Sequence, residues 1–140
     1  MAGHSTNTNL TLRCVVVTPE RTVVDTSAES VVLPMADGDY GILANHSPLI
    51  GRLGYGELRI RRGDTVDRYY ADGGFVEVAD NVVSVLTNRA VAADSLDAGT
   101  AAEQLQTALG RPAAGDEELA IRARLISQAR GQLRVAGKPR

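Results

Sequence analysis

Few side chains in this sequence carry groups that could act in catalysis, and they are scattered. His46 and Ser47 are adjacent, but nucleophilic catalysis needs a serine, a histidine and an orienting acid brought together by the fold, so adjacency is a weak signal. His4 is far from His46 and Cys14 is the only cysteine, so no metal-ligand spacing is present. Residues 38–41 contain two glycines, but the Gly-Lys-Ser/Thr of a phosphate-binding loop does not follow them. The residue types therefore predict neither a self-contained catalytic site nor a metal site.

The remaining reactive or acidic side chains have simpler structural explanations. Cys14 lies in an apolar, β-branched stretch, which favours a buried, inert thiol over a nucleophile. Asp37, Asp39 and Asp72 each lie beside a glycine, so we interpret them as turn residues before acids or bases. The Gly-Gly pair at residues 73–74 predicts a tight turn between two strands.

The composition is that of a soluble globular protein with an aliphatic core. The chain has 140 residues, 44% of them hydrophobic, with one Phe and no Trp, so Val, Leu, Ile and Ala must fill the core. A net charge of -2 argues against a general nucleic-acid binder. No segment approaches the roughly 20 apolar residues that span a bilayer, and residues 1–9 resemble neither a secretory signal nor a transit peptide. We expect residues 1–9 to be a disordered tail and the protein to stay in the cytoplasm, reaching a membrane only through partners.

Residues 10–91 show the alternation of apolar and polar residues that predicts β-strands. Short strand-like runs follow one another at close intervals, separated by turns rich in Gly, Asn and Asp, which tolerate positive φ. This pattern favours a β-sandwich or barrel. The runs lie at residues 10–17, 30–34, 58–61, 65–71, 75–78 and 82–87.

In residues 92–137 the period changes from two to about 3.6, which predicts helices. Asp94 or Ser95 is expected to cap the first helix, with Asp97 in its first turn. Gly-Arg-Pro at residues 110–112 should end that helix. The apolar residues at helical spacing are Ala98, Ala101, Ala102, Leu105, Ala108 and Leu109.

Asp116 is expected to cap a second helix, and because the connector before it is short, the two helices should form an antiparallel hairpin. Most apolar positions of the first helix are alanines, and a buried methylene-sized group contributes on the order of 0.8 kcal/mol, against roughly 1.5–3 for a buried leucine. Helices of this length are also marginally stable alone. The hairpin should therefore dock weakly and be able to detach. The apolar side of the second helix is expected to carry Leu119, Ala123, Ile126 and Leu133.

The second helix begins acidic and ends basic. From Arg122 onward every charged residue is basic. One interpretation is complementarity to the helix dipole together with a solvated face. The other is a docking surface for an acidic partner, and the sequence leaves both open. The basic residues on the helix are Arg122, Arg124, Arg130 and Arg134.

Three segments of the chain resemble the epsilon subunit of F-type ATP synthases. Residues 37–50 (DGDYGILANHSPLI) are similar to the family signature G-x-x-G-I-L-x-x-H-A-P-L, with Ser47 where alanine is usual. Residues 71–78 (ADGGFVEV) resemble the GGF-x-E-V strand of the family, and residues 132–135 (QLRV) resemble the end of its last helix. The spacing agrees across nearly the whole chain.

The resemblance implies an all-β sandwich N-terminal domain of about ten strands, residues 10–91, followed by a C-terminal α-helical antiparallel hairpin, residues 92–137. It implies that the sandwich binds the gamma subunit and the membrane c-ring as part of the rotating central stalk. Asp39 and His46 match family positions on a loop that contacts the c-ring. The hairpin would extend toward the alpha and beta subunits and oppose ATP hydrolysis. The residues expected to face the beta subunit are Arg122, Arg124, Arg130 and Arg134.

Some bacterial members of this family bind ATP between sandwich and hairpin, through a motif of the form I/L-D-x-x-R-A and two arginines on the second helix. Here Thr100 stands at the arginine of the motif, and the two helix arginines fall at Gln128 and Gln132. Glu77 and Asp97 remain, and both are anionic. A site that has lost three cations and kept two acids should repel ATP phosphates rather than bind them. We therefore expect a degenerate ATP site and no cofactor.

The resemblance thus predicts a non-catalytic epsilon subunit that couples proton translocation to ATP synthesis and inhibits ATP hydrolysis through its C-terminal helices. Its partners would be the gamma subunit, the c-ring and the alpha and beta subunits, at the cytoplasmic face of the bacterial plasma membrane. The alternative is a nucleotide-binding regulatory module, which would need cations at the matched positions. An unrelated small β-enzyme would need convergent acid, base or metal residues.

Overall fold

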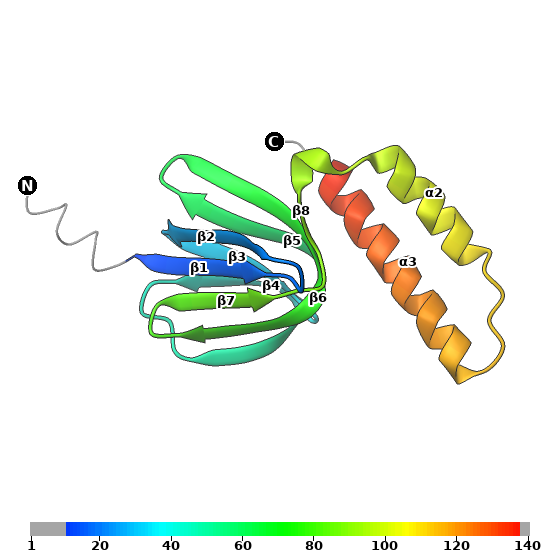
Figure 1. Ribbon diagram of the computed structural model, residues 1–140, viewed down its shortest axis with the longest axis horizontal. Coiled ribbons are helices and arrows are strands. Elements are labelled where there is room, and N and C mark those ends of the chain that lie inside the picture. Colours follow the sequence, from blue (N-terminus) through cyan, green and yellow to red (C-terminus); the bar gives the residue numbers. More distant parts are fainter. Residues whose placement is uncertain (1–10, 138–140) are drawn as a thin grey trace, which may run out of the picture.

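The computed structural model describes residues 11–137, and it places a β-sandwich beside two helices (Figure 1). The expected tail, residues 1–9, lies outside the described residues. The strands are β1 (Leu12–Val17), β2 (Thr22–Ala28), β3 (Ser30–Met35), β4 (Gly38–Leu43), β5 (Leu49–Arg62), β6 (Thr65–Ala79), β7 (Val82–Leu86) and β8 (Ala90–Ala92). After them come the 3-10 helix η1 (Ala93–Ser95) and the helices α2 (Ala98–Leu109) and α3 (Asp116–Gly137).

Two long strands, β5 and β6, join the layers of the sandwich, because each bends and contributes one half to each layer. One layer holds β4, β3, the second half of β5, the first half of β6 and β8. The other holds β2, β1, β7 and the remaining halves of β5 and β6, with β1 and β7 parallel and the other neighbours antiparallel. The described residues thus form eight continuous strands, which become the ten implied by the resemblance when the halves are counted separately. The predicted class, a β-sandwich followed by a helical hairpin, is confirmed.

The core of the sandwich follows from the period of two along its strands. In β1, Leu12, Cys14 and Val16 are buried and the intervening Arg13 is exposed. The main core has fourteen buried residues, which are Val, Leu, Ile, Ala and Cys, as the composition required, and all of them come from strands. The sandwich therefore has a hydrophobic core of its own that uses no residue of α2 or α3.

The bend of β6 lies at Gly73 and Gly74, whose φ angles are +69° and +113°. The prediction of a tight turn between two strands here was wrong, because β6 runs through both glycines. A Cβ on Gly74 would lie 2.0 Å from the carbonyl oxygen of Leu86, so only glycine allows this close approach to β7. Asp37 does lie in a turn, as expected, but Asp39 is a residue of β4 and Asp72 a residue of β6.

Both helices form where the period predicted them, although their first residues differ from the expected caps. The N-cap of α2 is Asp97, whose carboxylate accepts hydrogen bonds from the Gly99 amide at 3.2 Å and the Thr100 hydroxyl at 2.6 Å. The predicted caps, Asp94 and Ser95, belong to η1 instead. In α3 the amide of Leu119 donates to the carbonyl of Gly115 at 3.1 Å, so Asp116 is the first helical residue rather than the cap. As predicted, Gly110 terminates α2: the last helical residue is Leu109 and Gly110 is the C-cap.

The helical hairpin contacts the sandwich mainly through α3, while α2 packs on α3 (Figure 1). On α2 the buried residues are Ala101 and Ala108, both of which were predicted. The predicted side of α3 was wrong in its first half, since Leu119 and Ala123 are exposed, while the other two predicted residues, Ile126 and Leu133, are partly buried. The buried residues of α3 are Ala129, Gly131, Gln132 and Val135. Within residues 11–137, neither helix combines the length and the apolar character that crossing a bilayer demands.

Candidate regulatory interface between sandwich and hairpin

The C-terminal half of α3 lies against the bends of β5 and β6, and the apolar part of this contact is small. Its buried residues are Tyr70, Ala93 and Val135, with Tyr55 and Leu96 partly buried around them. These three buried residues compare with fourteen in the main core of the sandwich. Because hydrophobic stabilisation grows with the apolar area removed from water, docking of the hairpin contributes much less than folding of the sandwich.

Close backbone packing brings α3 onto β5 at Gly131. A Cβ on this residue would lie 2.6 Å from the carbonyl oxygen of Tyr55, closer than real Cβ contacts come. The same carbonyl accepts a hydrogen bond of 3.1 Å from the Arg134 guanidinium. The Tyr55 carbonyl is therefore a point of attachment for one turn of α3.

Beside this contact, a buried polar network joins β6 to α3. The Tyr70 hydroxyl donates to one carboxylate oxygen of Asp72 at 2.7 Å, and the Gln128 amide donates to the other at 3.2 Å. The Gln132 side chain lies beside the Tyr70 hydroxyl, where it acts to lower the pKa of that group. Burial, followed by the hydrogen bond to Asp72, raises the pKa of the Tyr70 hydroxyl, which therefore stays a neutral donor.

A cluster of charged residues on β5 and β6 also contacts the end of α3. The buried Glu57 carboxylate pairs with the guanidinium groups of Arg59 and Arg68. Arg68 also donates to the carbonyl of Val135 at 3.1 Å. This carbonyl lies in the last turn of α3, where the helix lacks amide partners and a cation is favourable.

Three of the five residues assigned to the degenerate ATP site surround one cavity of about 730 Å³ between the hairpin and β6. These are Thr100, Gln128 and Gln132. Asp97 does not line the cavity, and its bonds to Thr100 and Gly99, which also lower the pKa of its carboxyl, make it a helix cap. Glu77 is exposed on the far half of β6, so the structure does not bring it into the cavity.

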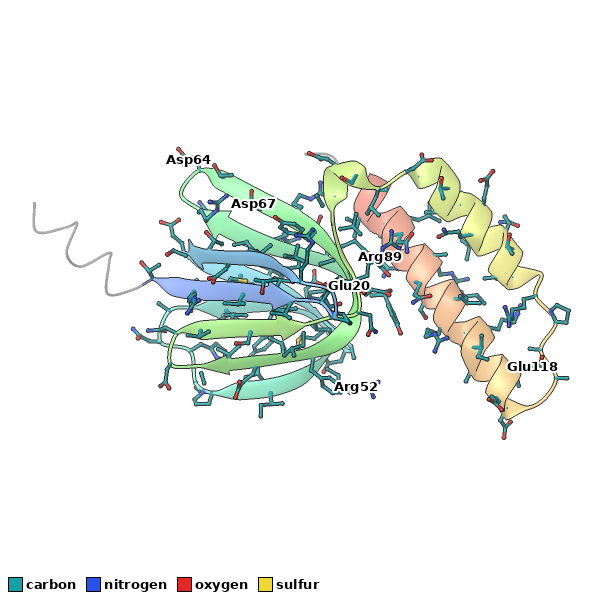
Figure 2. The ribbon with its side chains drawn as sticks, in the orientation of Figure 1. Glu20, Arg52, Asp64, Asp67, Arg89 and Glu118 are labelled. Atoms are coloured by element: carbon teal, nitrogen blue, oxygen red, sulfur yellow. The ribbon has the colours of Figure 1, made fainter. Side chains whose placement is uncertain are left out.

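The sequence did not reveal that Arg89 and Arg111 would line this cavity. Figure 2 shows Arg89 at the junction of the sandwich and α3. The two cations are matched by Asp72 and Glu103 in the same lining. The cavity therefore presents no excess of positive charge to a phosphate group.

The four basic residues of α3 divide into two groups. Arg122 donates to the carbonyl of Leu109 at 2.7 Å, which joins α3 to the end of α2, and Arg134 holds Tyr55. Arg124 and Arg130 are exposed and have no ion pair or hydrogen bond to another residue in the described part of the chain. Half of the predicted partner surface is thus engaged within the molecule.

The two residues predicted to contact the c-ring do not share one loop. Asp39 is exposed near the start of β4, and His46 lies in the turn after Leu43, about 13 Å of strand away. His46 hydrogen bonds to the carbonyl of Ser47 at 2.7 Å and to the Tyr40 hydroxyl at 3.2 Å. These bonds fix its ring, whereas Asp39 lies at the end of β4 nearer the bends of β5 and β6.

Three exposed apolar side chains, called the apolar row below, lie on the outer face of the layer that contains β7, where Ile50 is opposite Glu77 and diagonal to Phe75. They are Ile50, Phe75 and Leu86, which are 76%, 57% and 54% exposed. Phe75 pairs with Leu86 across β6 and β7. The alternation of β6 could have revealed the row, because Val76 and Val78 point inward and Phe75 must then point outward.

Comparisons with known proteins agree with this architecture. The family described as ATP synthase, Delta/Epsilon chain, beta-sandwich domain matches residues 11–93. The ATP synthase epsilon chain of Rhodopirellula baltica is 47% identical over 91% of this chain and 99% of its own length. That of Prochloron didemni is 41% identical over 91% of this chain and 96% of its own length.

Solved structures show the same fold at lower identity. A chain in the Euglena gracilis mitochondrial ATP synthase structure containing OSCP, F1 and the c-ring matches with a TM-score of 0.79 and 23% identity, covering 91% of this chain and 81% of that chain. A chain in the central stalk and c-ring structure from Tetrahymena thermophila matches with a TM-score of 0.71 and 14% identity, covering 89% and 96%. With a family match over most of the sandwich and close relatives along nearly its whole length, the chain belongs to the epsilon chain family of ATP synthases.

Proposed function

We propose that this epsilon subunit is a rotor component that couples proton translocation to ATP synthesis and restrains ATP hydrolysis through its hairpin. The observation that carries the proposal is the contrast between the core of the sandwich and the contact of the sandwich with α3. The sandwich has a large core of its own, whereas α3 docks through a small apolar cluster and a few hydrogen bonds. A rigid body with a weakly held arm suits a part that transmits torque and can also reach out.

The sandwich would bind the gamma subunit through the apolar row of Ile50, Phe75 and Leu86. Large apolar side chains grouped on an otherwise polar face are typical of protein interfaces. The turn that contains His46 would contact the polar loops of the c-ring, with Asp39 contributing from the end of β4. The subunit would thus be held peripherally at the cytoplasmic face of the bacterial plasma membrane and would supply no catalytic residues of its own.

The hairpin would detach and extend toward the alpha and beta subunits. Detachment would free Arg134 to join Arg124 and Arg130 as a cationic surface for an acidic partner. The α3 helix has 22 residues, so it is roughly 33 Å long and long enough to reach between neighbouring subunits.

The experiment is a truncation after Ala92, the last residue of β8, in the assembled ATP synthase. We expect the truncated subunit to copurify with gamma, because the sandwich keeps its core, and ATP hydrolysis to rise. Unchanged hydrolysis in a complex shown to contain the truncated subunit would rule out the inhibitory role.

A further inference from the structure

The acidic side chain of Asp72 is covered by α3. Only 9% of the residue is exposed, and its carboxylate lies under the hairpin, with Arg89 and Glu103 among the residues lining the same cavity. An ionised carboxylate accepts hydrogen bonds but cannot donate them, so whatever covers Asp72 must bring donors. Burying the charge without them would oppose docking.

The helix that covers Asp72 brings those donors on one face. Gln128 donates to the carboxylate, and Gln132, one turn later, lies beside the Tyr70 hydroxyl that also donates to Asp72. Gln132 is only 8% exposed, so the second glutamine is buried by the contact as well. Among the described residues, no buried side-chain polar atom lacks a partner, which means that the docked network is complete.

We propose that the Tyr70–Asp72 pair of β6 is the docking site for α3 and that Gln128 and Gln132 recognise it, so the hairpin docks through the chain's own hydrogen bonds and needs no bound ligand. This inference rests on the proposed inhibitory function only for its effect on ATP hydrolysis. Docking itself is a property of the isolated chain and is tested separately.

The test uses distances within the full-length chain. Spin labels are attached at Asp64→Cys, on the turn between β5 and β6, and at Glu118→Cys, in the first turn of α3, which lie far apart at opposite ends of the molecule (Figure 2). The native Cys14 is buried and its pKa is raised to about 12 by that burial, so it should not be labelled. Double electron-electron resonance then gives the ratio of docked to detached hairpin.

Gln128→Glu removes the donor and places a second carboxylate against Asp72. We expect the ratio of docked to detached hairpin to fall at least about tenfold, because Asp72 loses one of its two hydrogen-bond donors and gains a like charge at hydrogen-bond distance. Gln106→Glu is the matched control, since it makes the same change on an exposed residue of α2 and should keep the wild-type ratio.

A donor–acceptor exchange makes the test specific. In Asp72→Asn combined with Gln128→Glu, the asparagine amide can donate to the new glutamate while its oxygen still accepts from Tyr70. We expect this pair to recover most of the docked population. Recovery would assign the effect to this contact rather than to a general loss of helix stability.

Two outcomes would overturn the proposal: a wild-type ratio in Gln128→Glu, or no recovery in the exchanged pair when its sandwich melts like that of the wild type. If Gln128→Glu did not fold, Gln128→Ala would replace it, and a docked population equal to that of the wild type would equally overturn the proposal. The assembled enzyme separates this inference from the proposed function. If Gln128→Glu detaches the hairpin but leaves ATP hydrolysis unchanged, the docking site stands and the inhibitory role fails.

Discussion

Gly74 lies at the bend of β6, where both its backbone conformation and its surroundings favour glycine. Its φ of +113° is strained for any side chain, and an added Cβ would meet the backbone of Leu86 at 2.0 Å. Strain of this kind costs about 1–3 kcal/mol, and overpacking adds a similar amount. Gly74→Ala should therefore lower the free energy of unfolding by roughly 2–6 kcal/mol, measured by urea denaturation.

The control for this substitution is Gly41→Ala in β4. A Cβ at Gly41 meets nothing within 4 Å and its φ is ordinary, so alanine should be nearly neutral there. Equal stability of the two variants would contradict the claim that close approach to β7 requires a glycine at Gly74.

Cys14 and Tyr70 make the stability of the chain sensitive to alkali. Burial raises the pKa of the Cys14 thiol from 9.0 to about 12, and it raises that of Tyr70 as well. Above pH 9 the unfolded chain loses the thiol proton while the folded chain keeps it, so the unfolded state binds fewer protons and stability falls as pH rises. Each such group gives a slope of about 1.4 kcal/mol per pH unit until its folded pKa is reached.

The test is to measure the free energy of unfolding between about pH 8 and pH 11, a range that contains the first part of the expected fall in stability. Cys14→Val removes one of the two titrating groups, so the free energy of unfolding should fall less steeply with pH, whatever the effect of the substitution on stability at neutral pH. The same slope in the variant and the wild type would mean that the thiol ionises as readily in the folded protein as in the unfolded one.

At the scale of elements, the cavity between α2, α3 and β6 should bind ATP weakly. Thr100 is engaged by Asp97, Gln128 is engaged by Asp72, and the cations of the lining are matched by acids. We expect a dissociation constant for the isolated subunit no tighter than ~1 mM, about -4 kcal/mol, by titration calorimetry. Thr100→Arg alone should help little, and micromolar affinity of the wild type would show that Arg89 and Arg111 rebuild the site.

The two groups of arginines on α3 should behave differently in the assembled enzyme. Among the residues that the structure describes, Arg124 and Arg130 make no ion pair or hydrogen bond to another residue in the docked state, so Arg124→Gln with Arg130→Gln should weaken mainly the extended, inhibited state and raise ATP hydrolysis. The increase should shrink at high salt, because screening already weakens the wild-type attraction. Arg134→Gln differs from these two substitutions, because it removes the hydrogen bond to the Tyr55 carbonyl and should weaken docking of the hairpin as well. Hydrolysis independent of salt in both wild type and variant would leave these arginines as a solvated helix end.

The sequence was informative about elements and less so about their contacts. Period two and period 3.6 located the sandwich and the hairpin, because each element buries one face and its own residues show that face. The course of β6 through Gly73 and Gly74 was not predictable, since paired glycines are equally consistent with a turn, and only the approach of β7 explains them. The buried side of α3 was also missed, because its buried residues contain no leucine or isoleucine; they are Ala129, Gly131, Gln132 and Val135. Hydrogen bonds between polar side chains leave no periodic pattern of apolar residues in the sequence. The contact of α3 with Asp72 and Tyr70 could therefore not be predicted.

For the whole molecule, substitutions at two similar exposed residues test whether the apolar row is the face that binds gamma. Leu86 in the apolar row is 54% exposed, and Val66 in the first half of β6 is 47% exposed, so each tolerates a charge without disturbing the core. Burial of a leucine at an interface contributes roughly 1.5–3 kcal/mol, and a glutamate there would add the cost of desolvating a charge. Leu86→Glu should therefore weaken gamma binding about a hundredfold or more in a pull-down titration, while Val66→Glu should bind like the wild type. Equal binding by both variants, with both sandwiches melting normally, would move the gamma contact away from the apolar row. The proposed coupling would then have to pass through another face of the sandwich.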